Sequence, residues 1–286
     1  MAEQGQSSAV RLWGGRFESG PADALARLSV SVQFDWRLAP YDLLASRAHA
    51  RVLHKAGLLD DMELARLLTA IEDLSQSCKT GAFRPDAGDE DVHTALERGL
   101  LERAGSLGGK LRAGRSRNDQ VTTDLRLYLR DHVRLITLRL AELETALMDQ
   151  AHRHADTPAP GMTHMQHAQP VLFAHQLLAH VQALSRDAGR LRDWDKRAAI
   201  CPLGSGALAG SSLPLDPETV AAELGFDAAA PNSMDAVSDR DFAAEFGIAA
   251  ALLGVHLSRL GEEVVLWSSQ EFGWVEIDDA YATGSS

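Results

Sequence analysis

Apolar residues recur along the middle of the chain at the spacing of an α-helix. They follow one another three or four positions apart over several turns, at Leu125, Leu129, Val133, Ile136, Leu140, Leu143 and Leu147. Residues at this spacing share one helix face, so the pattern predicts a long helix with a continuous apolar seam. The proline- and glycine-rich stretch 157–161 cannot continue a helix and predicts where this one ends.

Two further long helices are predicted downstream. One covers residues 171–197, and its apolar face is formed by Phe173, Leu177, Val181, Leu184, Ala188 and Leu191. The other begins near Asp239 and carries Phe242, Phe246, Leu253, Leu257, Leu260 and Val264. Helices of about 25–35 residues reach up to ~50 Å, a length typical of an elongated bundle. Seams this long usually pack against other subunits as well.

The first third of the chain is divided into shorter predicted helices, over roughly residues 20–30, 40–57 and 60–77. Almost no stretch alternates apolar and polar residues with period two, so the predicted fold class is all-α. We expect an N-terminal helical domain over residues 1–112. It is followed by part of a long central helical bundle over residues 113–286.

Composition narrows the possible functions. The 286 residues carry 28 Lys and Arg against 40 Asp and Glu, a formal net charge of −12, so we expect no nucleic-acid partner. No apolar run of ~18 residues and no leader pattern is present, which predicts a cytoplasmic protein without a membrane partner. Cys78 and Cys201 predict neither a disulfide nor a zinc framework.

The segment 114–120 reads Gly-Arg-Ser-Arg-Asn-Asp-Gln and precedes the first long helix. Asn118 or Asp119 could cap that helix, whose first N–H groups would attract an anion. Arg115 and Arg117 add positive charge, and arginine can bind a carboxylate through two hydrogen bonds. The segment therefore suggests carboxylate recognition. The alternative is a capped helix with a solvated basic face.

A second polar segment, residues 163–170, places two histidines, a hydroxyl and two amides before the next helix. Such a loop supplies the donors and acceptors that hold a histidine acting as general acid or base. His164 and His167 are three positions apart and could instead suggest a metal ion. No third ligand has convincing spacing, so we expect no metal.

Two further signals are weaker. The acidic run 89–93 predicts a helix start, because acidic side chains are favoured in a first turn, and substrate contact by His93 is the alternative. The chain closes on Gly284-Ser285-Ser286, which by itself is ordinary loop sequence. No nucleophile elbow, phosphate loop or dinucleotide motif is present, so hydrolase and nucleotide-cofactor chemistry are poorly supported.

Taken together, these segments resemble the fumarase/aspartase superfamily, and specifically its argininosuccinate lyase family. The resemblance covers nearly the whole chain and rests on residues 12–17, 34–38, 90–94, 114–120, 163–170, 203–210, 232–235, 239–242 and 281–286. The segments 12–17 and 114–120 are specific to this family. The segment 163–170 and the final Gly-Ser-Ser are shared across the superfamily.

The resemblance implies a cofactor-free β-elimination that cleaves argininosuccinate into arginine and fumarate. It implies that Ser285 removes the proton next to a carboxylate and that His164 helps to protonate the departing guanidinium nitrogen. Donors that tighten on the doubly charged carboxylate of the resulting carbanion would lower the barrier most. The substrate-binding positions implied by the family motifs, or lying beside them, are Ser31, Asn118, Thr163, Ser116, Arg117 and His93.

The resemblance also implies a homotetramer whose sites each draw loops from three subunits, with argininosuccinate as the small-molecule partner. The family pattern continues past residue 286 with a lysine-containing loop and further helices. We therefore expect this chain to correspond to the N-terminal part of the family's chain and to release no fumarate alone. Two alternatives are another lyase of the superfamily, acting on adenylosuccinate, aspartate or malate, and a non-catalytic helical scaffold.

Overall fold

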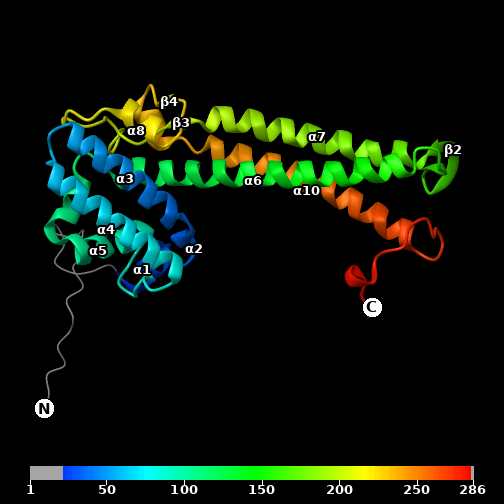
Figure 1. Ribbon diagram of the computed structural model, residues 1–286, viewed down its shortest axis with the longest axis horizontal. Helices are drawn as coiled ribbons and strands as arrows, with labels where there is room; N and C mark the ends of the chain where they lie inside the picture. Colours follow the sequence, from blue (N-terminus) through cyan, green and yellow to red (C-terminus); the bar gives the residue numbers. More distant parts are fainter. Residues whose placement is uncertain (1–21, 285–286) are drawn as a thin grey trace, which may run out of the picture. The chain divides into compact units, whose positions relative to one another are not determined.

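The computed structural model describes residues 22–284 and divides the chain into two compact units, shown together in Figure 1. The first unit comprises Met1–Tyr128 and Ala199–Asp239. The second comprises Leu129–Ala198 and Arg240–Ser286. The described residues are mainly helical, which confirms the predicted fold class. The domain boundary predicted between residues 112 and 113 stays a prediction.

The first unit is built from short and medium helices. Those predicted over residues 20–30, 40–57 and 60–77 are confirmed as α1, α3 and α4. The helices wholly within this unit are α1 (Asp23–Ser29), α2 (Val32–Asp35), η1 (Trp36–Leu38), α3 (Ala39–Lys55), α4 (Asp61–Thr80), α5 (Val92–Ala104), η2 (Gly105–Arg112), α8 (Pro217–Glu223) and α9 (Ser233–Ser238).

Two apolar clusters hold the first unit together. The larger one joins α3, α4 and α5 around side chains that are at most 1% exposed, among them Leu53, Leu67, Ile71, Leu74 and Leu96. The second joins α3 and the start of α6 to the segment after residue 199, through Ala45, Val52, Leu127, Leu203, Val220 and Phe226. In that segment, β3 (Ile200–Cys201) pairs in parallel with β4 (Ala228–Ala229). The second cluster thus brings residues far apart in sequence to the start of α6.

The three predicted long helices are present. They are α6 (Arg117–Arg153), which begins in the first unit and continues in the second, α7 (Phe173–Ala198) and α10 (Asp241–Ser268). Along α6 the predicted seam is buried at Leu129, Val133, Leu140 and Leu147. In the second unit α7 and α10 pack along their length.

Polar pairs fix the packing of α7 against α10. The indole Nε1 of Trp194 donates to the carbonyl of Phe242 at 2.7 Å. Nδ1 of His256 lies 2.6 Å from Oδ2 of Asp187. Farther along, Nε2 of His180 lies 2.8 Å from Oε2 of Glu263. These buried or half-buried pairs need specific partners, so they set which faces of the two helices meet.

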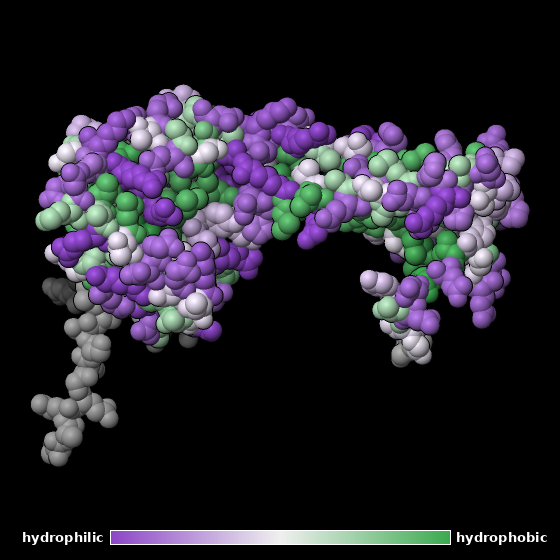
Figure 2. All heavy atoms as spheres, viewed as in Figure 1, coloured by the Kyte–Doolittle hydropathy of each residue, from purple (hydrophilic) through white to green (hydrophobic). Residues whose placement is uncertain are grey.

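One face of α10 is apolar and solvent-exposed. By length and composition α10 could cross a membrane, with a window of mean hydropathy 1.3 that is only 11% buried. Ile248, Leu252 and Val255 form an exposed stripe, and Figure 2 shows apolar atoms gathered where α10 runs in Figure 1. Paired Glu263 and His256 on the same helix would be costly in a bilayer. We therefore interpret α10 as a bundle helix.

A β-hairpin stands where a loop was predicted. β1 (Pro158–Thr163) pairs antiparallel with β2 (Gln166–Leu172), and the register shifts between Gly161 and Met162. The hairpin could not be predicted from patterning, because its strands carry three prolines and β2 is mostly exposed. It connects α6 to α7 within the second unit.

The start of α4 offers a direct test of local stability. Asp60 caps this helix, since its side chain accepts the Glu63 N–H while the Glu63 side chain accepts the Asp60 N–H. Asp60→Ala should lower the free energy of unfolding by ~1 kcal/mol in urea titrations. As a control, Asp73→Ala, on an exposed position of the same helix, should change it by less than about 0.5 kcal/mol. Equal losses in both variants would contradict the capping assignment.

Candidate active site

The segment 114–120 forms the start of α6, but neither Asn118 nor Asp119 caps it as predicted. The helix begins at Arg117, so Ser116 takes the capping position. Its Oγ accepts the Asn118 N–H at 3.3 Å, and Oδ1 of Asp119 accepts the Ser116 N–H at 2.9 Å. This reciprocal arrangement resembles a capping box, except that Asp stands in place of Glu or Gln and the hydroxyl accepts the N–H of the second rather than the third helical residue. The prediction was wrong because a cap at Asn118 or Asp119 would start the helix at residue 119 or 120, whereas α6 already starts at Arg117.

Asp119 is fully buried and fastens a second loop to α6. Its Oδ2 accepts the backbone N–H groups of Gly204 at 3.0 Å and Gly206 at 2.8 Å. Burial raises the pKa of Asp119, although these N–H groups and the charge of Arg115 partly offset that effect. Next to it, Nδ2 of the exposed Asn118 donates to the carbonyl of Ala207 at 2.9 Å. Two segments about 85 residues apart in sequence therefore meet at the first turn of α6.

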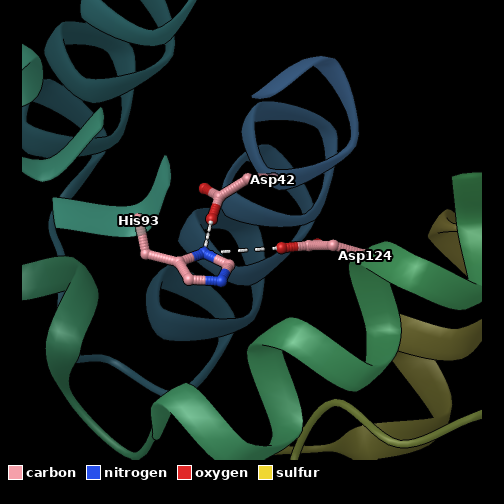
Figure 3. A group of neighbouring side chains, drawn as sticks. All are labelled: Asp42, His93 and Asp124. Atoms are coloured by element: carbon pink, nitrogen blue, oxygen red, sulfur yellow. Dashed lines mark hydrogen bonds and ion pairs between the residues drawn. The ribbon is translucent and has the colours of Figure 1, made fainter. Parts of the chain in front are cut away.

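Behind this loop lies a buried cluster of Asp42, His93 and Asp124, contributed by α3, α5 and α6 (Figure 3). Nδ1 of His93 lies 2.6 Å from Oδ2 of Asp42 and 3.7 Å from Oδ2 of Asp124. Gln120 and Ser46 also donate to Asp42. The sequence-predicted His93 is therefore an interior residue of the first unit.

The two carboxyl groups of this cluster differ in charge. Burial alone would raise the pKa of Asp42, but the hydrogen bond and charge of His93 outweigh it and hold that pKa at about 2. Burial and the nearby charge of Asp42 raise the pKa of Asp124 well above its usual range. Among the described residues no donor reaches either oxygen of Asp124, whereas a protonated Asp124 can itself donate to Asp42. The pKa values of the two carboxyl groups are thus shifted in opposite directions, which favours charge on Asp42 and a proton on Asp124.

Imidazole and carboxylate groups within 4.8 Å of one another are also a possible set of metal ligands. Asp42, however, already accepts from Gln120 and Ser46 and lies 2.6 Å from His93. A contact that short between two ligand atoms is a hydrogen bond and leaves no room for an ion between them. These contacts favour proton sharing over metal binding.

A cavity of about 470 Å³ adjoins the cluster in the first unit. His93, Ser116 and Arg117 line it together with Arg112 and Arg115, so the structure brings three predicted residues to one place. Nε of Arg117 lies 3.5 Å from a carboxylate oxygen of Asp91, and Nη2 lies 3.5 Å from one of Glu97. Three guanidinium groups around one cavity can bind a carboxylate ligand.

Ser31 lies directly before α2, in the same unit. Its N–H donates to the carbonyl of Glu90 at 2.9 Å, and its Oγ donates to Asp35. Asp35 in turn accepts the N–H of Val92 at 3.1 Å. These contacts tie Ser31 to the start of α5, next to His93.

Thr163 and His164 belong to the second unit, at the tip of the hairpin. His164 and Met165 form a two-residue turn with φ angles of 51° and 60°, closed by the pairing of Thr163 with Gln166. Two consecutive left-handed residues are usual for Asn-Gly but strained for side chains of this size. The His164 side chain is exposed. Because strained backbone positions cluster at functional sites, this turn makes His164 a candidate functional residue.

Ser285 lies outside the described residues 22–284. The other predicted residues fall into two groups, Ser31, His93, Ser116, Arg117 and Asn118 in the first unit and Thr163 and His164 in the second. Sequence reasoning missed Asp42 and Asp124. The available signal was that Gln120 and Asp124 lie four positions apart, on one face of the predicted helix.

The assigned protonation states predict how stability depends on pH. A carboxyl group with a raised pKa in the folded state keeps its proton where the unfolded chain has lost it. Its contribution is therefore lost as pH rises from the ordinary value of 3.8. Asp124→Asn carries no titrating proton, so its melting temperature should rise relative to that of wild type as the pH increases above 3.8.

Asp149→Asn, on an exposed position of the same helix, is the matched control and should show no such trend. A large, pH-independent loss of stability in Asp124→Asn would mean that Asp124 acts as a charged partner of His93.

The chain is similar in sequence to known lyases. A family model described as a lyase matches residues 15–286. The chain is 75% identical over 278 residues to argininosuccinate lyase of Acidothermus cellulolyticus and 74% identical over 277 residues to that of Frankia casuarinae, covering 97% of this chain in each case. Thermobifida fusca argininosuccinate lyase is 60% identical over the full chain.

Solved structures give the same fold. An EDDS lyase in complex with formate is 31% identical, with a TM-score of 0.80 over 91% of this chain and 51% of that chain. A fumarate lyase from Mesorhizobium is 25% identical, with a TM-score of 0.67 over 88% of this chain and 59% of that one.

The chain spans 57% to 60% of the length of the three argininosuccinate lyases named above. The match itself covers almost every residue of this chain. The capped start of α6, the long bundle helices and the hairpin histidine therefore occur in a chain that belongs to the lyase family of the fumarase/aspartase superfamily.

Proposed function

We propose that this chain forms part of an argininosuccinate lyase, which cleaves argininosuccinate to arginine and fumarate without a cofactor. The observation that carries the proposal is the identity of 60% to 75% to proteins of that name over 97% or more of the chain. The site geometry agrees with a substrate that carries several carboxylates, because guanidinium and amide donors gather at the start of α6.

In the proposed reaction, binding of the substrate carboxylates falls to the first unit. Arg117 is the first residue of α6 and follows Ser116, so the helix N–H groups and the guanidinium charge act together there. Asn118 is exposed and held by Ala207, so it is poised to contact a ligand. His93 lines the same cavity as Arg117, and Ser31 is hydrogen-bonded to Glu90 near the start of α5, which carries His93. Donors fixed in this way stabilise the charge that develops when the carbon next to a carboxylate loses its proton.

The second unit supplies Thr163 and His164. An exposed imidazole on a strained two-residue turn is held away from its own chain, so it can reach a substrate bound elsewhere. In the proposed reaction, His164 gives a proton, directly or through another group, to the guanidinium nitrogen as the carbon–nitrogen bond breaks. The proton-abstracting base is Ser285, in the family's Gly-Ser-Ser.

The active protein is proposed to be a cytoplasmic homotetramer that completes each site with loops from several subunits. The support is the exposed apolar stripe of α10, where Ile248 is 65% and Val255 is 55% exposed. A contiguous apolar face on a long bundle helix is usually covered by another helix. A second copy of the chain offers such a helix with matching character.

The activity can be tested by joining residues 1–286 to the part of the Acidothermus cellulolyticus relative that the match does not cover. This joined protein should release fumarate from argininosuccinate, followed by the ultraviolet absorbance of fumarate. His164→Asn should lower kcat by about 10²–10⁴-fold, because a positioned proton donor contributes that much.

His167→Asn is the control, since this residue is also exposed on the hairpin but has no proposed role. If the joined protein shows no turnover, the proposed activity is refuted. That outcome would favour a non-catalytic scaffold. Full turnover by His164→Asn removes this residue from the mechanism.

The assembly can be tested on α10. Ile248→Glu places a charge in the exposed apolar stripe and should shift the joined protein to smaller species in sedimentation velocity, because burying an unpaired charge is costly. Met62→Glu, at an exposed apolar position of α4, should leave the distribution unchanged. A tetramer that survives Ile248→Glu would place the contact elsewhere.

A further inference from the structure

The glycine-rich segment 203–210 has no role in the chemistry above, yet it touches a proposed substrate-binding residue. Leu203, Ser205 and Gly206 are buried, whereas residues 207–210 are exposed. The exposed part lies beside Asn118, through the hydrogen bond from Nδ2 of Asn118 to the Ala207 carbonyl. What fixes this segment therefore also fixes Asn118.

We propose that Asp119 is a positioning residue of the substrate site, which holds the segment 203–210 against the first turn of α6 and acts on the substrate through Asn118. The proposal rests on the proposed function for the identity of the substrate. Asp119 itself is 0% exposed, so it cannot touch a ligand.

The geometry of Asp119 supports this role. Its two oxygens accept three backbone N–H groups, one from Ser116 on its own helix start and two from Gly204 and Gly206. A carboxylate is the side chain that can accept all three, because an amide would turn N–H donors toward at least one of them. The Asp119 side chain therefore connects the start of α6 to the segment 203–210 through three hydrogen bonds.

The conformation of the segment 203–210 suits its hydrogen bonds to Asp119. Gly206 has a φ of +61°, and a Cβ there would lie 2.7 Å from the Gly210 carbonyl oxygen. The Gly210 N–H donates to the Ser205 carbonyl at 2.7 Å, which closes the segment into a tight loop. The loop thus turns the N–H groups of Gly204 and Gly206 toward the same oxygen of Asp119.

The first test does not depend on activity. In wild type, hydrogen exchange of the segment 203–210 should be slow for a loop, and in Asp119→Asn it should be about tenfold faster. Asp216→Asn, which alters a comparable aspartate that caps α8, should leave exchange there unchanged. Fast exchange of this segment in wild type would overturn the proposal, even if Asp119→Asn fails to fold.

The second test measures the effect on substrate in the joined protein. Asp119→Asn should raise KM for argininosuccinate about tenfold while kcat changes less than about threefold, because binding geometry is disturbed and the reacting groups are not. Gly206→Ala, which distorts the loop but leaves Asp119 in place, should have the same effect. Asp216→Asn should change neither constant.

A double-mutant cycle with Asn118→Ala decides whether Asp119 acts through Asn118. In the Asn118→Ala background, Asp119→Asn should raise KM by less than about twofold further. Fully additive effects would overturn the proposed route and leave Asp119 a purely structural residue. If the wild-type joined protein shows no turnover, the proposed function fails, and the exchange experiment still decides whether Asp119 holds the loop.

Discussion

The burial of carboxyl groups around the start of α6 is the constraint on which the first unit depends. Asp42, Asp119 and Asp124 are at most 2% exposed. Burying a neutral polar group without a hydrogen-bond partner costs about 2–7 kcal/mol, and burying an unpaired charge costs more. The chain meets this cost in a different way at each residue. Backbone N–H groups donate to Asp119, side-chain donors surround Asp42, and at Asp124 burial raises the pKa and so favours the neutral form.

These solutions also decide what faces the solvent. Asp119 and Ser116 hold the first turn of α6 in place, and Asn118 is left exposed beside the segment 203–210. Asn118, which is proposed to contact the substrate, is therefore held by the segment 203–210, which the buried Asp119 fixes in turn. In the second unit, histidine–carboxylate pairs between α7 and α10 similarly leave an apolar stripe pointing outward.

Much of this architecture could be predicted from the sequence, because apolar spacing reports helix faces directly. The seam from Leu125 to Leu147 located α6, and the stretch 157–161 located its end. The buried cluster could not be predicted, since Asp42 and His93 are about 50 positions apart and polar residues in a first helical turn usually face water. The hairpin was missed because its strands do not alternate. The motif segments identified candidate residues, but they did not predict which of those residues are buried.

The turn at His164 and Met165 has a consequence for how such a protein can be improved. Left-handed backbone at two non-glycine residues costs about 1–2 kcal/mol at each. Asn-Gly would close the same hairpin at lower energy. A laboratory selection for thermal stability alone would therefore favour replacement of these two residues, and the His164 imidazole would be lost. Consensus or stability-based redesign of the chain should therefore keep these two residues fixed.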